Sequence, residues 1–124
     1  MKTNTRLFGD KWETAAESFL HNRGLSTHQR NFYSRFGEID LIMRDGEEFV
    51  FVEVRFREDE RHGSGAETVT KHKQAKLTRA ALYFLCLNPR YSQNPCRFDV
   101  ISITSKRNET EFNWIKNAFD STSG

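Results

Sequence analysis

The chain has 124 residues, of which 36% are hydrophobic and 13% aromatic, and this composition favours a folded domain over a disordered chain. It lacks the apolar run of roughly 20 residues that a membrane helix needs. Residues 1–8 do not contain the apolar core of a signal peptide. The two cysteines form neither a disulfide framework nor a zinc pattern. We therefore expect a single cytoplasmic domain over residues 1–124 without a membrane partner. The net charge of +2 does not by itself indicate nucleic acid.

The N-terminal part of the sequence predicts a helix followed by a strand. Apolar positions recur at helical spacing from Gly9 to about Arg23, and Gly24 ends the helix. The apolar stripe of this helix consists of Trp12, Ala15, Ala16, Phe19 and Leu20. Residues 1–8 are expected to form a loose, flexible leader, and residues 25–33 are expected to form a first strand.

A β-hairpin is predicted next, with strands over residues 37–44 and 47–56. Asp45-Gly46 between them is a strong two-residue turn signal because both positions tolerate positive φ. The resulting register places Glu38 opposite Glu53. Opposed residues share a face, as do residues two apart, so one face of the hairpin is predicted to be core. That face consists of Ile39, Leu41, Met43, Val50, Val52, Val54 and Phe56.

The other face gathers Glu38, Asp40, Glu53 and Arg55 at the end far from the turn. Like charges placed opposite each other destabilise a sheet, so three carboxylates need a compensating partner. Mg²⁺ takes oxygen ligands and usually binds one or two carboxylates plus a substrate phosphate, and Asp40 and Glu53 are close enough in this register to share one ion. Such an ion can polarise a phosphodiester oxygen. An ion-pair network of Glu38 and Glu53 with Arg55 or Arg35 remains the alternative.

The second half of the chain predicts one helix and two strands. A charged, glycine-containing loop over residues 57–65 precedes a long helix over residues 66–87. Residues 97–103 are predicted to form a strand buried on both sides, residues 111–115 a last strand, and residues 120–124 a frayed tail. The expected order is α-β-β-β-α-β-β, with no linker that would divide two domains.

The second helix carries a basic stripe of Lys73, Lys76 and Arg79, which are neighbours on one helical face. Together with Arg57 and Arg61, this stripe could lie along a phosphate backbone. A solvated helix surface is the alternative. Carboxylates that meet DNA need such positive neighbours, because they would otherwise repel it.

An aspartate followed through a hairpin by Glu-x-Lys marks the PD-(D/E)xK nuclease superfamily, which the chain resembles at Asp40 and Glu53-Val54-Arg55. More closely, it resembles the bacterial YraN family of uncharacterised proteins. The matching segments are Gly9-x-x-x-Glu13-x-x-Ala16-x-x-Phe19-Leu20, Gly37-Glu38-Ile39-Asp40-Leu41-Ile42, Phe51-Val52-Glu53-Val54-Arg55, Lys73-Gln74 and Arg97-Phe98-Asp99-Val100. The resemblance implies an α/β, restriction-endonuclease-like fold with a mixed central sheet flanked by helices, as in archaeal Holliday-junction resolvases. Within these segments, Asp99 is expected to fix local structure rather than to bind metal.

The resemblance further implies a metal-dependent nuclease that acts on nucleic acid, with DNA as the expected partner and repair or recombination as the setting. Asp40 and Glu53 carry over as ligands of Mg²⁺ or Mn²⁺, and Glu13 carries over as the acid of the first helix. Periodicity alone does not separate Glu13 from Glu17, one turn further on. A homodimer is an open alternative to a monomer. The competing hypothesis is a non-catalytic module that keeps the fold and binds DNA or a repair protein.

The lysine position of the superfamily is occupied by Arg55, and this departure bears on mechanism. Arginine stays protonated, so Arg55 can bind phosphate but cannot act as a base. Lys73 on the second helix is a candidate supporting residue in its place. Glu38 is expected to be either an outer ligand or the partner of an arginine.

Overall fold

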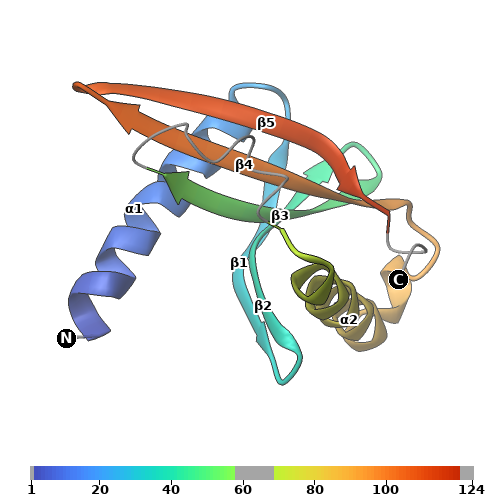
Figure 1. The fold of residues 1–124 in the computed structure, drawn as a ribbon. Coiled ribbons are helices and arrows are strands. Elements are labelled where there is room, and N and C mark those ends of the chain that lie inside the picture. The colour runs from blue at the N-terminus through green and yellow to red at the C-terminus, as the bar shows by residue number, and fades with distance from the viewer. Residues whose placement is uncertain (1, 58–68, 121–124) are drawn as a thin grey trace.

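A five-stranded mixed sheet carries the two α-helices of the described residues (Figure 1). The computed structural model describes residues 2–57 and 69–120, with the backbone alone over residues 2–8. The elements are α1 (Lys2–His21), β1 (Ser26–Ser34), β2 (Gly37–Asp45), β3 (Glu48–Arg57), α2 (Lys71–Leu87), η2 (Pro89–Tyr91), β4 (Cys96–Lys106) and β5 (Glu109–Phe119). The strands lie in the order β1-β2-β3-β4-β5, and each neighbouring pair is antiparallel except the parallel β3–β4 pair. This arrangement confirms the predicted element order, with η2 in addition, and the predicted fold class.

The sheet is buried on both faces because its central strands alternate apolar side chains between two cores. Phe49 and Phe51 of β3 pack with Phe84 of α2, whereas Val50 and Val52 pack with Leu20 of α1. Successive residues of a strand point to opposite faces, so α1 and α2 cover opposite faces of the sheet. The predicted core face is buried from Ile39 to Val52, while Val54 and Phe56 are partly buried.

Both helices begin at positions other than the predicted ones. α1 begins at Lys2 rather than Gly9, so the segment expected as a loose leader is helical from Lys2 onward. α2 begins at Lys71, where Thr70 caps it by accepting a hydrogen bond from the Lys73 N–H at 3.1 Å. Residues 58–68 and 121–124, which hold most of the predicted loop and tail, lie outside the described residues. Within the described part of the chain, neither helix has the length and apolar character that a membrane crossing requires.

The β2–β3 hairpin has a different turn from the predicted one. Asp45 pairs with Glu48, so the two-residue turn is Gly46-Glu47 rather than Asp45-Gly46. Gly46, with φ of 63°, takes the first turn position, where a type II′ turn favours glycine. Ile42 consequently faces Phe51 instead of Phe49. Because this shift is an even number of residues, Leu41, Met43, Val50 and Val52 still share the predicted face and pack under α1. Ile39, beyond the end of the ladder, packs instead with the core under α2, so its predicted face is wrong.

β2 and β3 separate at the end of the hairpin that lies far from the turn. Their ladder ends at the Leu41–Val52 pair, and beyond it β2 pairs with β1 while β3 pairs with β4. Glu38 lies opposite Tyr33 of β1, so the predicted Glu38–Glu53 pairing is wrong. A fork between strands leaves backbone groups without a ladder partner, and side chains must satisfy them. The predicted acids lie at this fork.

Arg97 of β4 contacts Asp45 and Glu48 at the turn end of the hairpin, and Asp99 of β4 holds Arg97 in place. The Asp99 side chain is 0% exposed and accepts hydrogen bonds from Arg97 Nε at 3.1 Å and from Trp114 Nε1 at 2.9 Å. The backbone N–H of Asn117 donates to the same carboxylate at 2.9 Å, where the register of β5 shifts. These contacts confirm that Asp99 fixes local structure.

Candidate metal and phosphate site

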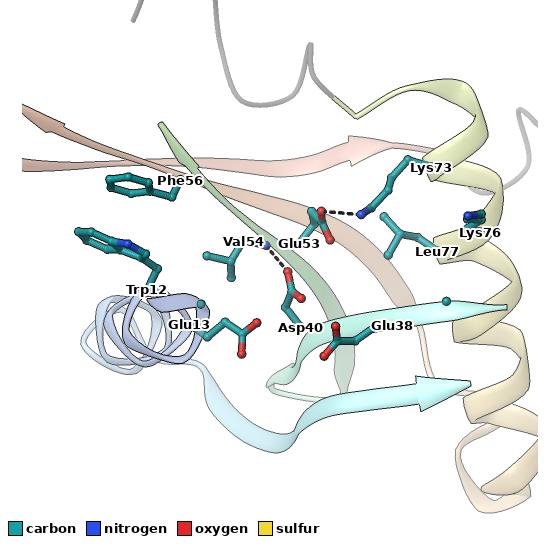
Figure 2. A pocket seen from close by; sticks show the side chains of 12 residues that line it. Trp12, Glu13, Glu38, Asp40, Glu53, Val54, Phe56, Lys73, Lys76 and Leu77 are labelled. Atoms are coloured by element: carbon teal, nitrogen blue, oxygen red, sulfur yellow. Dashed lines mark hydrogen bonds and ion pairs between the residues drawn. The ribbon is translucent and has the colours of Figure 1, made fainter. Parts of the chain in front are cut away.

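The fork opens onto a cavity of about 360 Å³ that residues of both helices and of β2 and β3 line (Figure 2). The lining combines carboxylates, two lysines and an aromatic wall: Gly9, Trp12, Glu13, Gly37, Glu38, Asp40, Glu53, Val54, Phe56, Lys73, Lys76 and Leu77. Trp12 stacks on Phe56 with ring centroids 4.2 Å apart and forms this wall. The fold therefore brings together all four predicted acids and both predicted lysines.

Three carboxylates converge in the cavity (Figure 2). Oxygen atoms of Glu13, Glu38 and Asp40 lie within 4.8 Å of one another. The side-chain amide of Asn31 donates to Glu13 at 2.8 Å and to Glu38 at 3.0 Å, so one neutral group serves two acids. Burial is the main cause that raises the pKa of Glu13, and the charge of Glu38 raises it further.

Asp40 occupies the fork itself. Its carboxylate accepts a hydrogen bond from the Val54 N–H at 2.8 Å, and this bond joins β2 to β3 where their ladder has ended. Burial raises the pKa of Asp40 to about 8, the charge of Glu53 adds to the rise, and the Val54 bond opposes it. Asp40 therefore holds a proton near neutral pH in the absence of a cation. A metal ion would displace that proton, because carboxylates ligate metals in their deprotonated form.

Glu53 is buried between two cations. Its Oε2 lies 3.2 Å from Lys73 Nζ and 3.4 Å from Arg55 Nη1, and its side chain is 6% exposed. Lys73 lines the cavity, whereas Arg55 contacts Glu53 from outside the described lining. The Glu53–Arg55 pair is the contact that the ion-pair alternative predicted. The ammonium group that the structure places inside the cavity comes from α2 and not from β3.

The structure directs Glu13, and not Glu17, toward the cavity. Glu17 accepts a hydrogen bond from the Thr27 hydroxyl and lies 3.6 Å from Arg30. The same arginine is 3.9 Å from Glu13, so it ties α1 to β1 beside the cavity. Glu38 finds its partner in Asn31, while Arg35 stacks on the ring of Phe36.

The structure places only some of the predicted nucleic-acid contacts at the cavity. Lys73 and Lys76 line the cavity, and Lys76 is exposed. Arg79 is exposed further along α2, and Arg57 lies at the end of β3. Arg61 lies outside the described residues. Positive charge from α2 is therefore present at the cavity and continues along the helix.

The donor set of the cavity suits a hard divalent cation. Among the described residues the lining contains neither histidine nor cysteine, so its charged donors are carboxylate oxygens, which Mg²⁺ and Mn²⁺ prefer. The raised pKa values of Asp40 and Glu13 also mark a place where an added positive charge is favourable. Asp40 belongs both to the predicted pair with Glu53 and to the observed cluster with Glu13 and Glu38.

Sequence reasoning missed Asn31 and assigned Trp12 to the core alone. Asn31 has φ of 51° inside β1, a left-handed conformation that asparagine adopts more readily than most residues. An asparagine within a predicted strand is itself uncommon, and this was the available signal. Trp12 does pack against Phe56, as its stripe position predicts, and it also borders the cavity.

Comparison with known proteins finds relatives that match this chain over nearly their whole length. The sequence model of Uncharacterised protein family UPF0102 matches residues 12–103. A UPF0102 protein of Aliivibrio salmonicida is 46% identical over 118 residues, which cover 94% of each chain. One from Nitrosomonas europaea is 47% identical over 112 residues, covering 90% of this chain and 92% of the relative. One from Stutzerimonas stutzeri is 44% identical over 113 residues, covering 91% and 94%.

Proposed function

Because the chain belongs to Uncharacterised protein family UPF0102, whose name states no activity, we propose its function from the site: metal-dependent hydrolysis of phosphodiester bonds in nucleic acid. Family membership confirms the resemblance to the YraN family of uncharacterised bacterial proteins. The observation that carries the proposal is the convergence of Glu13, Glu38 and Asp40 within 4.8 Å, beside buried Glu53 and the Lys73 ammonium. The restriction-endonuclease-like fold supports phosphate chemistry by analogy.

Asp40 is the central ligand in this proposal. It belongs to the acid cluster and shares the cavity with Glu53, and its side chain is held in place by the Val54 N–H. Glu53 is the second ligand, and Glu13 and Glu38 are the remaining oxygen donors at the cavity. A bound Mg²⁺ or Mn²⁺ would supply Lewis-acid activation of water and of the phosphate.

Lys73 and Arg55 offer a substrate phosphate different contacts. Lys73 lines the cavity and is 42% exposed, so its flexible ammonium can turn from Glu53 to a phosphate oxygen. Arg55 is permanently charged and serves as the secondary phosphate contact. Lys76 extends positive charge to the neighbouring phosphates of a strand.

Titration with Mn²⁺ tests the metal site before any substrate is known. The parent protein should bind the ion saturably, and its unfolding temperature should rise with Mn²⁺ because the ion binds the folded state. Asp40→Asn should lose most of that rise, and Glu53→Gln should weaken it. Glu47→Gln, which removes an exposed acid at the hairpin turn, should behave like the parent. Equal Mn²⁺ binding by the parent and an Asp40→Asn, Glu53→Gln double variant would refute the ligand assignment.

Cleavage of linear, flapped and four-way DNA in Mn²⁺ tests the reaction. Asp40→Asn should lower the cleavage rate by about a hundredfold or more, as expected when a group that stabilises the transition state is lost. Lys73→Met should lower it more than Arg55→Met, because Lys73 is the cation inside the cavity. Arg55→Lys should retain cleavage.

One observation favours the non-catalytic alternative. The charge of Glu53, the most buried acid of the site, is already matched by Lys73 and Arg55, as it would be in a scaffold. That alternative predicts DNA binding without saturable Mn²⁺ binding and without cleavage. The Mn²⁺ titration therefore separates the two functions.

A further inference from the structure

Tyr33 presents a large aromatic ring beside the acid cluster. It is 63% exposed although it lies within β1, where it pairs with Glu38 of β2. Opposed residues of an antiparallel ladder share a face, so Tyr33 lies on the face of Glu38, whose carboxylate belongs to the cluster. Asn31, two positions before Tyr33 on the same strand, donates to that carboxylate. Tyr33 therefore flanks the cavity at its acidic end.

Cations and further rings continue from this point around the turn that joins β1 to β2. Arg35 is exposed there, with its guanidinium carbon 4.9 Å from the centre of the Phe36 ring. Phe36 contacts Tyr83 of α2 at a centroid distance of 5.9 Å, and Tyr83 is 38% exposed. The same turn approaches Lys76 at Gly37, where an added Cβ would lie 3.7 Å from the Lys76 Cβ. Gly37 and Lys76 both line the cavity, so this turn and its contact with α2 lie next to the cavity lining.

Exposed rings beside cations are the means by which proteins bind unpaired bases, because the rings stack with bases while the cations neutralise phosphates. In a continuous duplex the bases stack on one another, so their faces are not offered to a protein ring. We propose that the site takes a nucleic-acid strand whose bases are unpaired next to the phosphate in the cavity, with Tyr33 stacking on such a base. This inference rests on the proposed function and names the substrate class of that same site.

A single exposed ring on a protein surface is ordinary, so the placement of Tyr33 carries the argument. Leu82 shows the contrast. It is 58% exposed on α2, but it borders a separate apolar groove with Phe51 and Phe98, whose lining shares no residue with the cavity. Leu82 is therefore a matched control for the loss of an exposed large side chain.

Fluorescence anisotropy at low salt in EDTA tests the proposal without metal or cleavage. The probes are a labelled oligothymidine of about fifteen nucleotides, an abasic strand of equal length and charge, and a duplex of that length. The parent should bind oligothymidine more tightly than the other two. Tyr33→Ala should weaken oligothymidine binding about fivefold or more and leave abasic-strand binding unchanged. Tyr33→Phe and Leu82→Ala should bind oligothymidine as the parent does.

Two results would overturn the proposal: equal binding of oligothymidine and the abasic strand by the parent, or unchanged oligothymidine binding by Tyr33→Ala. A change in sedimentation caused by Tyr33→Ala, without a change in oligothymidine binding, would instead assign the ring to a contact between copies of the chain. Because no metal is present, a protein that fails the Mn²⁺ titration can still pass this test. Failure of the proposed function and failure of this inference are thus distinguishable.

Discussion

Acids lie at both ends of the β2–β3 hairpin, but the hydrogen-bond donors and cations around them differ. At the turn end, Arg97 lies 3.1 Å from Asp45 and 2.7 Å from Glu48. These two acids are also partly exposed, so water helps to solvate them. Asp99, which Arg97 binds, is fully buried and accepts hydrogen bonds at both carboxylate oxygens, including a bifurcated one from Arg97 Nε. Each of these three acids is therefore solvated or bonded within the protein.

At the fork end the acids have fewer donors. Asp40 receives one backbone N–H, while Glu13 and Glu38 share the neutral amide of Asn31 and Glu13 has a distant contact of 3.9 Å with Arg30. Burial and neighbouring acids consequently raise the pKa values of Asp40 and Glu13. The comparison separates an acid that serves the scaffold, which is fully bonded, from a candidate ligand, which is under-bonded and surrounded by like charge.

Asparagine substitutions at Asp99 and Asp40 test this difference most directly. The larger change in the free energy of unfolding is expected at Asp99. Asp99→Asn removes the charge that Arg97 binds and sets an amide N–H₂ among three donors. Breaking a buried ion pair typically costs about 3–5 kcal/mol, and we expect a fall of that order in the free energy of unfolding in urea. The exposed-site control Glu47→Gln should change it by less than about 0.5 kcal/mol. An unchanged urea midpoint for Asp99→Asn would show that the brace does not stabilise the fold.

Asp40→Asn should have the opposite sign in the metal-free protein. The pKa of Asp40 is about 8 in the fold against an ordinary value of 3.8, so between these values the folded state holds a proton that the unfolded chain has lost. The stability contributed by neutral Asp40 is therefore fully present below pH 4 and declines as the pH rises to about 8. Asparagine resembles the protonated acid at every pH and can still accept the Val54 bond.

The stability difference between Asp40→Asn and the parent should accordingly be near zero at pH 4 and grow to about 2 kcal/mol or more in favour of the variant at pH 8. Urea denaturation in EDTA across this range measures it, and the difference removes the contribution of other titrating groups. A variant less stable than the parent at pH 8 would contradict the assignment of Asp40 as an under-bonded acid.

The faces of the paired part of this hairpin, Leu41 to Val52, were predictable from sequence, but its register was not. Alternation of apolar and acidic residues placed Asp40 and Glu53 on one side, and an even shift could not alter that. The turn depended on a contact from another strand, since Arg97 of β4 bridges Asp45 and Glu48 and so favours their pairing. Local turn preferences contain no information about such a partner.

Contacts between elements also limited the prediction of the site. Helical periodicity left Glu13 and Glu17 equivalent, and the choice is made by Asn31 and Thr27 of β1, which bond one acid each. Lys73 was recognised as a candidate, but its reach to Glu53 depends on how α2 packs over the sheet. The resemblance to a known family supplied the ligand pair, whereas the acid cluster depends on the separation of β2 from β3, which no local pattern in the sequence reveals.

The smallest expected effect concerns Glu53, where the two ends of the comparison meet, because this acid is bonded like a scaffold residue yet lies in the cavity. A double-mutant cycle of Glu53→Gln with Lys73→Met should give a coupling energy of about 0.5–1 kcal/mol in EDTA, since Lys73 is 42% exposed and solvent screens the pair. A cycle with Arg55→Met provides the matched control, because Arg55 contacts the same oxygen at 3.4 Å from outside the cavity lining. If Glu53 serves as a metal ligand, saturating Mn²⁺ competes with Lys73 for its carboxylate and the coupling should shrink. A coupling that Mn²⁺ leaves unchanged would place Glu53 with Asp99 among the scaffold acids and would favour the non-catalytic module.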